Sequence, residues 1–395
     1  MKRKGLLSLV LALATILYLG AAPASGPIVI GVIGAVSGSS ASLGKAQQQG
    51  VELAVAEINA AGGIMGRPVK AVYRDDEADP TKALTAAQEL VDREGINFLV
   101  GTTNSTPAAT VIPFLQDNKI VSITSIATSN TIIDAAKYPY AFRVFIPNGL
   151  QANALVANAK QRGYKKIALV ADTSALGVDG MAAMVKYSAQ YGVKPVAQVT
   201  YQSDDADMSP VAQSLKNSGA DCALFWTLGA DGAKIVKALE RIGYIDKLRI
   251  YGYTGIGMPN FNELAGPGAS RVASLGVKDW AVANSKSQLK GRFLDLYKKI
   301  MAKYGAYAPG KRDTNPYHVA AAYDCVMLLK WAIETAGTTD PDAVKAAIET
   351  KGSTYQGNFG GSYKFSATDH DGFRPEDCVP VDIADKVNGD LQVLR

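Results

Sequence analysis

Histidine is scarce in this chain, and its scarcity limits the catalysis that the sequence can support. Only His318 and His370 occur among the 395 residues, so an imidazole metal site or a nucleophile–base pair would have to recruit one of them. His318 opens an apolar run and is predicted to pack against or cap a helix. His370 lies between two aspartates and is predicted to occupy a solvated turn. Neither histidine has the neighbours of a catalytic base.

Nucleophilic chemistry has equally weak support. The sequence contains no G-x-S-x-G nucleophile elbow and no H-E-x-x-H pair. A hydrolase that uses Ser105 or Asp172 stays open as an alternative, but a serine without a nearby histidine or lysine is a poor nucleophile near neutral pH. We therefore expect no enzyme and no catalytic residue.

Glycine-rich and acidic runs also fall short of cofactor motifs. Gly38–Lys45 looks like a phosphate loop, but five residues separate its glycines where that motif has four, and Ala46 stands where the Mg²⁺-binding hydroxyl belongs. Gly31, Gly34 and the glycine that follows miss the dinucleotide-binding spacing. The acids Asp75–Glu77 read as a solvated approach to a helix. We expect no cofactor and no metal.

Two small polar clusters are better placed for binding. Asn104-Ser105-Thr106 follows a strand that is predicted to end near Gly101, and Ile126-Ala127-Thr128 follows one that ends at Thr124. Ligands of open α/β sheets bind beyond the carboxyl ends of strands, where free N–H groups of helices favour an anion. An ordinary cap or turn is the alternative for either hydroxyl. Both clusters are candidate ligand contacts.

The elements that would hold these clusters alternate along the chain. Runs rich in valine and isoleucine predict strands at Ile28–Ile33, Val69–Arg74, Phe98–Val100, Ile120–Thr124, Lys166–Ala171, Val196–Tyr201, Cys222–Trp226 and Arg249–Gly252. The segments between them have helical periodicity. Acceptor–proline pairs predict helix starts at Asp79, Ser209 and Asp340. This alternation predicts an α/β fold of two doubly wound lobes with parallel sheets.

The amino terminus has the pattern of a secretory signal peptide. Lys2–Lys4 precede the apolar run Leu6–Leu19, which ends near Ala22-Pro23-Ala24. The run is about 14 residues, short of the roughly 20 that cross a bilayer, and an uncleaved anchor is the alternative. We expect residues 1–24 to be removed and the mature chain to be periplasmic.

Charge and cysteine content narrow the partners. The formal net charge of +5 falls by three with the loss of Lys2–Lys4, and the remaining basic residues are interspersed with acids, so no nucleic-acid surface is indicated. In an oxidising compartment Cys325 is expected to pair with Cys378, because Cys222 lies in an apolar strand. Three buried or reduced thiols are the alternative.

The length left after the signal peptide predicts two domains. We place residues 25–146 and 278–360 in lobe 1, and residues 147–277 and 361–395 in lobe 2. The sequence has no flexible linker between them, which favours short crossovers that act as a hinge. We expect a monomer.

Several motifs together resemble those of a known family, the branched-chain amino-acid-binding (leucine/isoleucine/valine-binding) proteins of ABC importers. They are Ile30–Gly38, Gln49–Ala54 leading into Glu57–Gly66 (EINAAGGIMG), Asp75–Pro80 (DDEADP), Val100-Gly101 with Ser105, and Ile123–Thr128. The likeness spans most of the mature chain and is looser in its second half. It implies a type I periplasmic-binding-protein fold whose lobes close around a small ligand.

The resemblance also implies a ligand site. Members of the family hold the ligand carboxylate with the counterparts of Ser105 and Thr128 and with the main chain at Ile126. The acids that meet the ligand ammonium in amino-acid binders are replaced by Asn148 and Thr254. Because a buried ammonium without a carboxylate costs several kcal/mol, these changes weaken the prediction of an amino-acid ligand.

The expected aromatic wall differs as well. Leu176 and Leu43 stand where tyrosines are common in the family, and Tyr253 lies next to the replaced acid. Trp226 either supplies another wall or is a buried strand residue. Ala78 and Asn104 occupy the positions of the family disulfide, so that bond is expected to be absent.

The resemblance implies capture of a small carboxylate and delivery to an ABC permease in the inner membrane. We expect an aromatic or aliphatic acid rather than a zwitterionic amino acid. A sensor module that docks to a membrane receptor is the alternative, since both uses need the same cleft.

Overall fold

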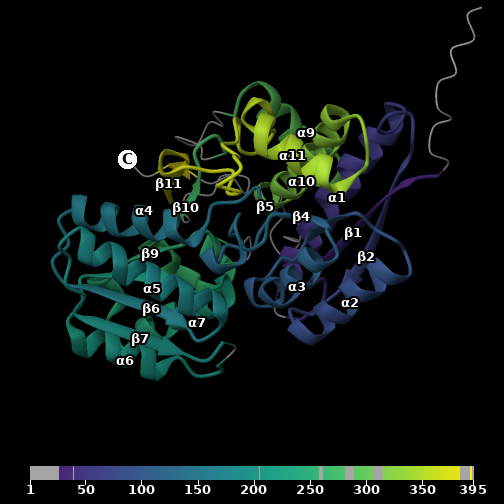
Figure 1. The fold of residues 1–395 in the computed structure, drawn as a ribbon. Helices are drawn as coiled ribbons and strands as arrows, with labels where there is room; N and C mark the ends of the chain where they lie inside the picture. Colours follow the sequence, from purple (N-terminus) through teal and green to yellow (C-terminus); the bar gives the residue numbers. More distant parts are fainter. Residues whose placement is uncertain are drawn as a thin grey trace, which may run out of the picture.

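The chain forms two α/β lobes in a computed structural model, with their sheets side by side and helices around each (Figure 1). The structure describes residues 26–38, 40–203, 205–257, 261–280, 289–305, 315–382 and 392–393. The predicted signal peptide lies outside these residues. Within them, no helix combines the length and apolar character that a membrane crossing needs.

The first sheet has the strand order β2-β1-β3-β4-β5, and all its pairings are parallel. Its strands are β1 (Ile28–Gly34), β2 (Val69–Asp75), β3 (Phe98–Gly101), β4 (Val121–Thr124) and β5 (Ala141–Arg143). The connecting helices are α1 (Ala41–Ala60), α2 (Pro80–Asp92) and α3 (Ser105–Asp117). Successive side chains alternate between faces, so Leu99 packs with α2 and α3 while Phe98 and Val100 face the larger core.

The second sheet has the order β12-β11-β10-β9-β8-β6-β7. Its strands are β6 (Ile167–Asp172), β7 (Ala197–Tyr201), β8 (Cys222–Trp226), β9 (Arg249–Gly252), β10 (Val272–Val277), β11 (Cys378–Asp382) and β12 (Gln392–Val393). Its helices are α4 (Asn148–Gln161), α5 (Ala175–Gln190), α6 (Ser209–Ser218), α7 (Gly229–Arg241) and α8 (Phe261–Ala265). The predicted parallel order holds from β7 to β10, whereas β11 pairs antiparallel with both its neighbours.

Three later helices return to the first sheet, where they appear yellow-green beside α1 in Figure 1. They are α9 (Gly291–Tyr304), α10 (Pro316–Ala336) and α11 (Pro341–Lys351). Helix α10 crosses α1 closely at Gly50, where an added Cβ would lie 2.3 Å from the carbonyl oxygen of Val319. A larger residue could not fit there without moving one helix.

The connections between sheets are few. The chain leaves β5 for α4 through residues 144–147, returns between β10 and α9, and crosses again between residues 371 and 378. Asp371 bridges to Arg143 of β5, and β11 then joins the second sheet. Residue pairs far apart in sequence therefore meet where the lobes join.

Two of the three predicted helix caps are confirmed. The Asp79 carboxylate accepts hydrogen bonds from the amides of Thr81 and Lys82, and the Asp340 carboxylate accepts one from Ala343. The predicted helix start at Ser209 is confirmed, but its predicted role as the N-cap is wrong, because Ser209 is the first residue of α6 and Met208 occupies the N-cap position without a side-chain cap.

The predicted Cys325–Cys378 disulfide is also wrong. All three cysteines are free and buried. Cys222 lies in β8, Cys325 in α10 and Cys378 in β11. The alternative of three buried thiols is the correct one.

His370 does not occupy the solvated turn predicted for it. The imidazole is 1% exposed and stacks on the Phe142 ring at 4.1 Å. Its Nδ1 lies 3.0 Å from the carbonyl of Ala141, and its Nε2 lies 3.2 Å from a Glu349 carboxylate oxygen. Burial lowers the pKa of His370. Its role is to pack β5 against the carboxy-terminal segment.

Asp76 likewise departs from the predicted solvated acidic run. Its side chain is fully buried and accepts a hydrogen bond from the Ala78 amide at 2.9 Å. Burial, with the nearby charges of Asp75 and Asp79, raises the pKa of Asp76 to about 6. The carboxylate holds the turn between β2 and α2.

Candidate functional site

A small cavity of about 30 Å³ lies between the two lobes. Both lobes contribute, and the lining residues are Leu43, Thr103, Asn104, Ser105, Ile126, Ala127, Thr128, Phe145, Leu176, Leu228, Tyr253, Thr254, Gly255 and His318. Eight of the ten sequence-predicted site residues are in this set. The other two, Asn148 and Trp226, lie behind it.

The first-lobe side of the cavity is built on the start of α3. Ser105 is the first residue of the helix, and Asn104 before it makes no side-chain cap. The side-chain amide of Asn104 instead donates a hydrogen bond to the Ser40 hydroxyl at 2.9 Å. The helix therefore presents N–H groups without a side-chain acceptor, in an electrostatic setting that favours an anion.

The Ser105 hydroxyl has a defined polarity. Its oxygen accepts hydrogen bonds from the backbone amides of Thr128 at 3.3 Å and Ser129 at 3.2 Å. The side chain is 3% exposed. With its oxygen engaged by two donors, the hydroxyl proton is left to donate to a further group, and the two N–H groups strengthen it as a donor.

The loop after β4 completes this side. The Thr124 hydroxyl accepts a hydrogen bond from the Ala127 amide at 3.3 Å, and the Thr128 carbonyl accepts one from the backbone amide of Asn148 at 2.7 Å. Ile126 and Thr128 are buried at the cavity wall. The loop is thus held on one side by its own strand and on the other by the start of α4.

The second-lobe side is mostly apolar. Leu176 lies at the start of α5, Leu228 precedes α7, and Tyr253 and Thr254 follow β9. The Thr254 amide donates to the Gln151 side-chain oxygen at 2.9 Å. Burial raises the pKa of Tyr253 well above its usual range, so this phenol is neutral.

Trp226 is a buried strand residue that supports this wall. It is completely buried, and its ring stacks on Tyr253 with centroids 4.9 Å apart and planes at 13°. An added Cβ at Gly180 would lie 2.3 Å from the indole. Trp226 therefore fixes the Tyr253 ring from behind.

Asn148 also lies outside the lining. It is fully buried, and its side-chain amide donates to the Asp179 carboxylate at 2.7 Å. The same carboxylate accepts from the Asn130 amide nitrogen of the other lobe at 2.7 Å. Asn148 is thus bonded both to Thr128 of the cavity wall and to Asp179 at the boundary between the lobes.

The lobes are closed in this structure. Leu43 and Ile126 of the first lobe form an apolar cluster to which Leu228 of the second lobe adds. Asn130 and Asp179 are hydrogen-bonded across the same boundary. A cavity of about 30 Å³ has room for little more than a few water molecules, so a ligand needs a wider separation of the lobes.

The described cavity wall contains no carboxylate, lysine or arginine side chain. Among the lining residues that the structure describes, none is Asp, Glu, Lys or Arg, and the rest are hydroxyl, amide, aromatic, aliphatic or imidazole groups. Asp172 lies nearby at the end of β6, where Ser174 bonds to its carboxylate and burial raises its pKa. The wall can supply hydrogen-bond donors but no counter-charge for a cation.

A hydrolase that uses Ser105 would need a base beside its hydroxyl. The hydrogen-bond partners of the Ser105 hydroxyl within the described chain are the two backbone amides. His318, which sequence reasoning did not place in the site, lines the cavity, and its Nδ1 lies 2.7 Å from the Asn315 side chain. No nucleophile–base pair joins Ser105 to this imidazole in the described residues.

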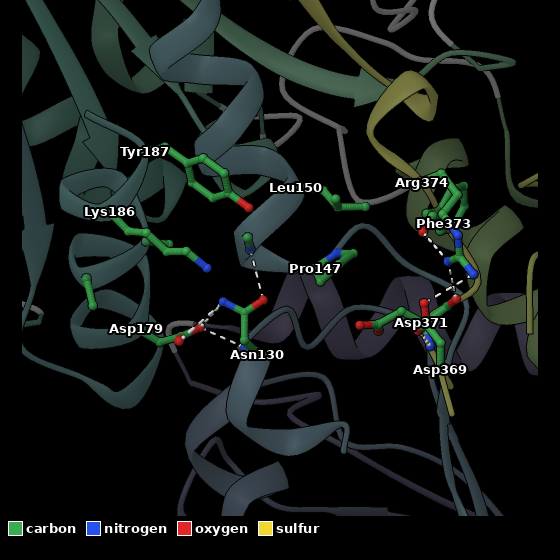
Figure 2. A pocket seen from close by; sticks show the side chains of 13 residues that line it. Asn130, Pro147, Leu150, Asp179, Lys186, Tyr187, Asp369, Asp371, Phe373 and Arg374 are labelled. Atoms are coloured by element: carbon green, nitrogen blue, oxygen red, sulfur yellow. Dashed lines mark hydrogen bonds and ion pairs between the residues drawn. The ribbon is translucent and has the colours of Figure 1, made fainter. Parts of the chain in front are cut away.

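A second, open groove runs along the seam between the lobes (Figure 2). It measures about 460 Å³, and its lining residues are Asn130, Pro147, Gly149, Leu150, Asp179, Ala182, Ala183, Lys186, Tyr187, Asp369, Asp371, Phe373 and Arg374. In Figure 2 Asn130 lies between Asp179 on one side and Asp371 on the other. The groove exposes the interlobe hydrogen bonds to solvent.

Comparisons with known proteins agree with these features. A model of the periplasmic binding protein family matches residues 27–385. The chain is 30% identical over 345 residues to the Leu/Ile/Val-binding protein homolog 3 of Brucella melitensis, covering 86% of this chain and 87% of that protein.

Two solved structures are similar across nearly the whole chain. One is a periplasmic binding protein type 1 from Bordetella pertussis Tohama I, with a TM-score of 0.82 at 24% identity, covering 93% of this chain and 100% of that one. The other is a solute-binding protein of an ABC transporter from Rhodopseudomonas palustris HaA2 in complex with p-hydroxybenzoic acid, with a TM-score of 0.79 at 25% identity, covering 93% and 96%.

Proposed function

Because this chain belongs to the periplasmic binding protein family, in its branched-chain amino-acid-binding branch, we propose that it is the solute-binding component of an ABC importer and captures a small carboxylate between its lobes. Its two parallel-sheet lobes have the type I fold of that family. The similar proteins are solute-binding proteins and not enzymes.

The observation that carries the proposal is the one-sided polarity of the cavity. Ser105, the start of α3 and the loop at Ile126–Thr128 offer hydroxyl and amide donors on the first lobe. Donors of this kind solvate a carboxylate without a counter-charge. The proposed ligand therefore places its carboxylate against these groups.

The opposite wall favours an uncharged ligand tail. Leu176, Leu228 and Tyr253 face the donors from the second lobe, and Thr254 supplies no charge. An ammonium group left here without a carboxylate partner would cost several kcal/mol. The Rhodopseudomonas protein bound to p-hydroxybenzoic acid supports an aromatic acid, while the Leu/Ile/Val-binding relative supports an aliphatic side chain of similar bulk.

Matched ligands test this proposal. Isothermal titration with leucine and with 4-methylpentanoate compares two molecules that differ by the amino group, and benzoate against benzyl alcohol isolates the carboxylate. We expect 4-methylpentanoate or benzoate to bind at least tenfold more tightly than leucine, and benzyl alcohol not to bind. Tight leucine binding with no response to plain acids would reject the uncharged-tail ligand.

The remaining parts of the proposal concern the setting of the protein. We infer cleavage of residues 1–24, a periplasmic monomer, and delivery of the loaded form to an inner-membrane permease. The lobe boundaries are proposed as residues 25–146 with 278–360, and 147–277 with 361–395. Mass spectrometry of the exported protein tests whether residues 1–24 are removed.

A further inference from the structure

Arg143 is a buried cation that lies behind the first-lobe donors. It ends β5, and its side chain is fully buried. Its Nε donates to the Asp371 carboxylate at 2.6 Å, so the charge is paired. Its Nη1 donates to the carbonyl oxygens of Ser129 at 2.7 Å and Ala127 at 3.4 Å. One guanidinium thus holds two carbonyls of the ligand loop.

Because the peptide bond is planar, binding of a carbonyl by Arg143 also fixes the direction of the N–H group in the same peptide. In a trans peptide the C=O and the following N–H point in opposite directions, and the peptides of this loop are trans. The carbonyl of Ala127 faces Arg143, so the amide of Thr128 faces away from it and meets the Ser105 hydroxyl. Arg143 therefore orients an amide of the candidate carboxylate site.

The second peptide unit faces the other lobe. The carbonyl of Ser129 is bonded to Arg143, and the amide of Asn130 in the same peptide donates to Asp179 of α5 at 2.7 Å. The Asn130 side chain adds contacts to the same carboxylate at 3.2 and 3.3 Å. Figure 2 shows Asn130 directed at Asp179 across the seam. This contact exists only while the lobes are closed together.

We propose that Arg143, tethered by Asp371, is a positioning residue that couples the carboxylate site to lobe closure through residues 127–130. The guanidinium polarises both peptides, which strengthens their N–H groups as donors. One of these donors supports Ser105, and the other reaches Asp179. The part that concerns the ligand rests on the proposed function, whereas the orientation of the loop does not.

Asp371, which binds the Arg143 guanidinium, also links the ligand loop to a segment that crosses between the lobes. Asp371 belongs to the segment that crosses between the sheets, and the backbone on either side of it pairs with Arg143. The Arg143 amide donates to the His370 carbonyl at 3.0 Å, and the Arg143 carbonyl accepts a hydrogen bond from the Gly372 amide at 3.0 Å. A crossover segment and the ligand loop are thus joined at one side chain. Movement of the crossover would be transmitted to the loop.

A first experiment reads the loop without any ligand. Residue-resolved hydrogen exchange is measured for the Thr128 and Asn130 amides in the wild type and in the R143K, D371N and R271K variants. Lysine cannot bridge Asp371 and two carbonyls, so we expect R143K to raise both exchange rates at least tenfold. D371N should raise them in the same direction, and it keeps the test decisive if R143K fails to fold.

R271K is the matched control, because the Arg271 guanidinium also binds backbone carbonyls, those of Leu248 and Asp246 in the other lobe. It should leave the two amides unchanged. Unchanged exchange in both R143K and D371N, or an equal rise in R271K, would overturn the positioning role.

A second experiment measures the coupling, with 4-hydroxybenzoate as the probe. We expect at least a tenfold loss of affinity in R143K, at least a fivefold loss in D179N, and a loss in the double variant well below the product of the two. Effects that multiply within twofold would show independent contacts and overturn the coupling. If the wild type binds no carboxylate, the proposed function fails, and the exchange experiment alone decides on Arg143.

Discussion

Ser105 shows how a residue without a catalytic partner can still be chemically specific. Its oxygen is engaged by the amides of Thr128 and Ser129, which leaves its proton for a third group. The same hydroxyl beside a general base would be a nucleophile. Here the surrounding donors make it an anchor for an anion.

Removing either first-lobe hydroxyl should weaken carboxylate binding. Ser105→Ala and Thr128→Val each leave the ligand short of a donor, and we expect a loss of roughly 1–3 kcal/mol per substitution. Isothermal titration with 4-hydroxybenzoate measures the loss. Ser214→Ala on the exposed face of α6 serves as the control, and unchanged affinity in both cleft variants would show that the carboxylate binds elsewhere.

Adding an acid to the second lobe should change ligand preference. Thr254 is 6% exposed and lines the cavity, so Thr254→Asp places a carboxylate near the ligand. We expect plain acids to bind more than tenfold more weakly, and the ratio of leucine to 4-methylpentanoate affinity to rise. Thr254→Asn is the neutral control of similar shape. An unchanged ratio would contradict the role assigned to this position.

Some site residues were predictable and others were not, for a physical reason. Ser105, Thr128 and Thr254 follow strand ends, where the α/β topology brings side chains together. Leu228 obeys the same rule two residues after β8, although it was not selected. His318 and Phe145 reach the cavity through the packing of α10 and the crossover after β5, which no local pattern encodes.

At the scale of elements, the eight strands predicted from apolar runs agree with the structure to within one residue at each end, whereas the equally apolar β10 was missed. Two other missed strands carry contrary signals: β5 is three residues long and ends in Arg143, whose burial depends on Asp371. Strand β11 contains Pro380, which paired strands usually exclude except near edges. Tertiary partners override the local preference in both cases.

The turn between β2 and α2 should make stability depend on pH through Asp76. Its pKa is about 6 in the folded chain against an ordinary value of 3.8, so the folded state keeps a proton that the unfolded state loses between these values. Stability therefore falls as pH rises through this window, by up to about 3 kcal/mol.

Urea unfolding of the wild type and Asp76→Asn at several pH values between 4 and 8 tests this statement. We expect the stability difference to shift in favour of the variant as pH rises to 6 and then to level off. Asp92→Asn at the end of α2 controls for a general change in charge. A difference that is independent of pH would contradict the buried, protonated carboxyl group.

For the whole molecule, alternation of strands and helices was enough to predict two lobes, but not how they meet. The contacts that hold them together, such as Asn130 with Asp179 and Leu43 with Leu228, join residues distant in sequence. No sequence motif predicts that the residues of either pair lie in contact. The closed arrangement is a property of surfaces that form only after each lobe has folded.

The small cavity predicts an opening motion that solution scattering can measure. A space of about 30 Å³ cannot admit an aromatic acid, so entry requires separated lobes. We expect the ligand-free protein to have a larger radius of gyration than the closed structure, and saturation with ligand to reduce it. A ligand-free scattering profile that already matches the closed structure, together with measurable binding, would contradict this motion.

The burial of Cys222, Cys325 and Cys378 has a practical consequence for optical work on this protein. Burial raises the pKa of each thiol, which suppresses the reactive thiolate, so a maleimide dye should leave the folded wild type unlabelled. A cysteine introduced at Ala182, exposed in the seam groove, would then carry the dye alone. Its emission would report the changing width of the groove as a fluorescence signal.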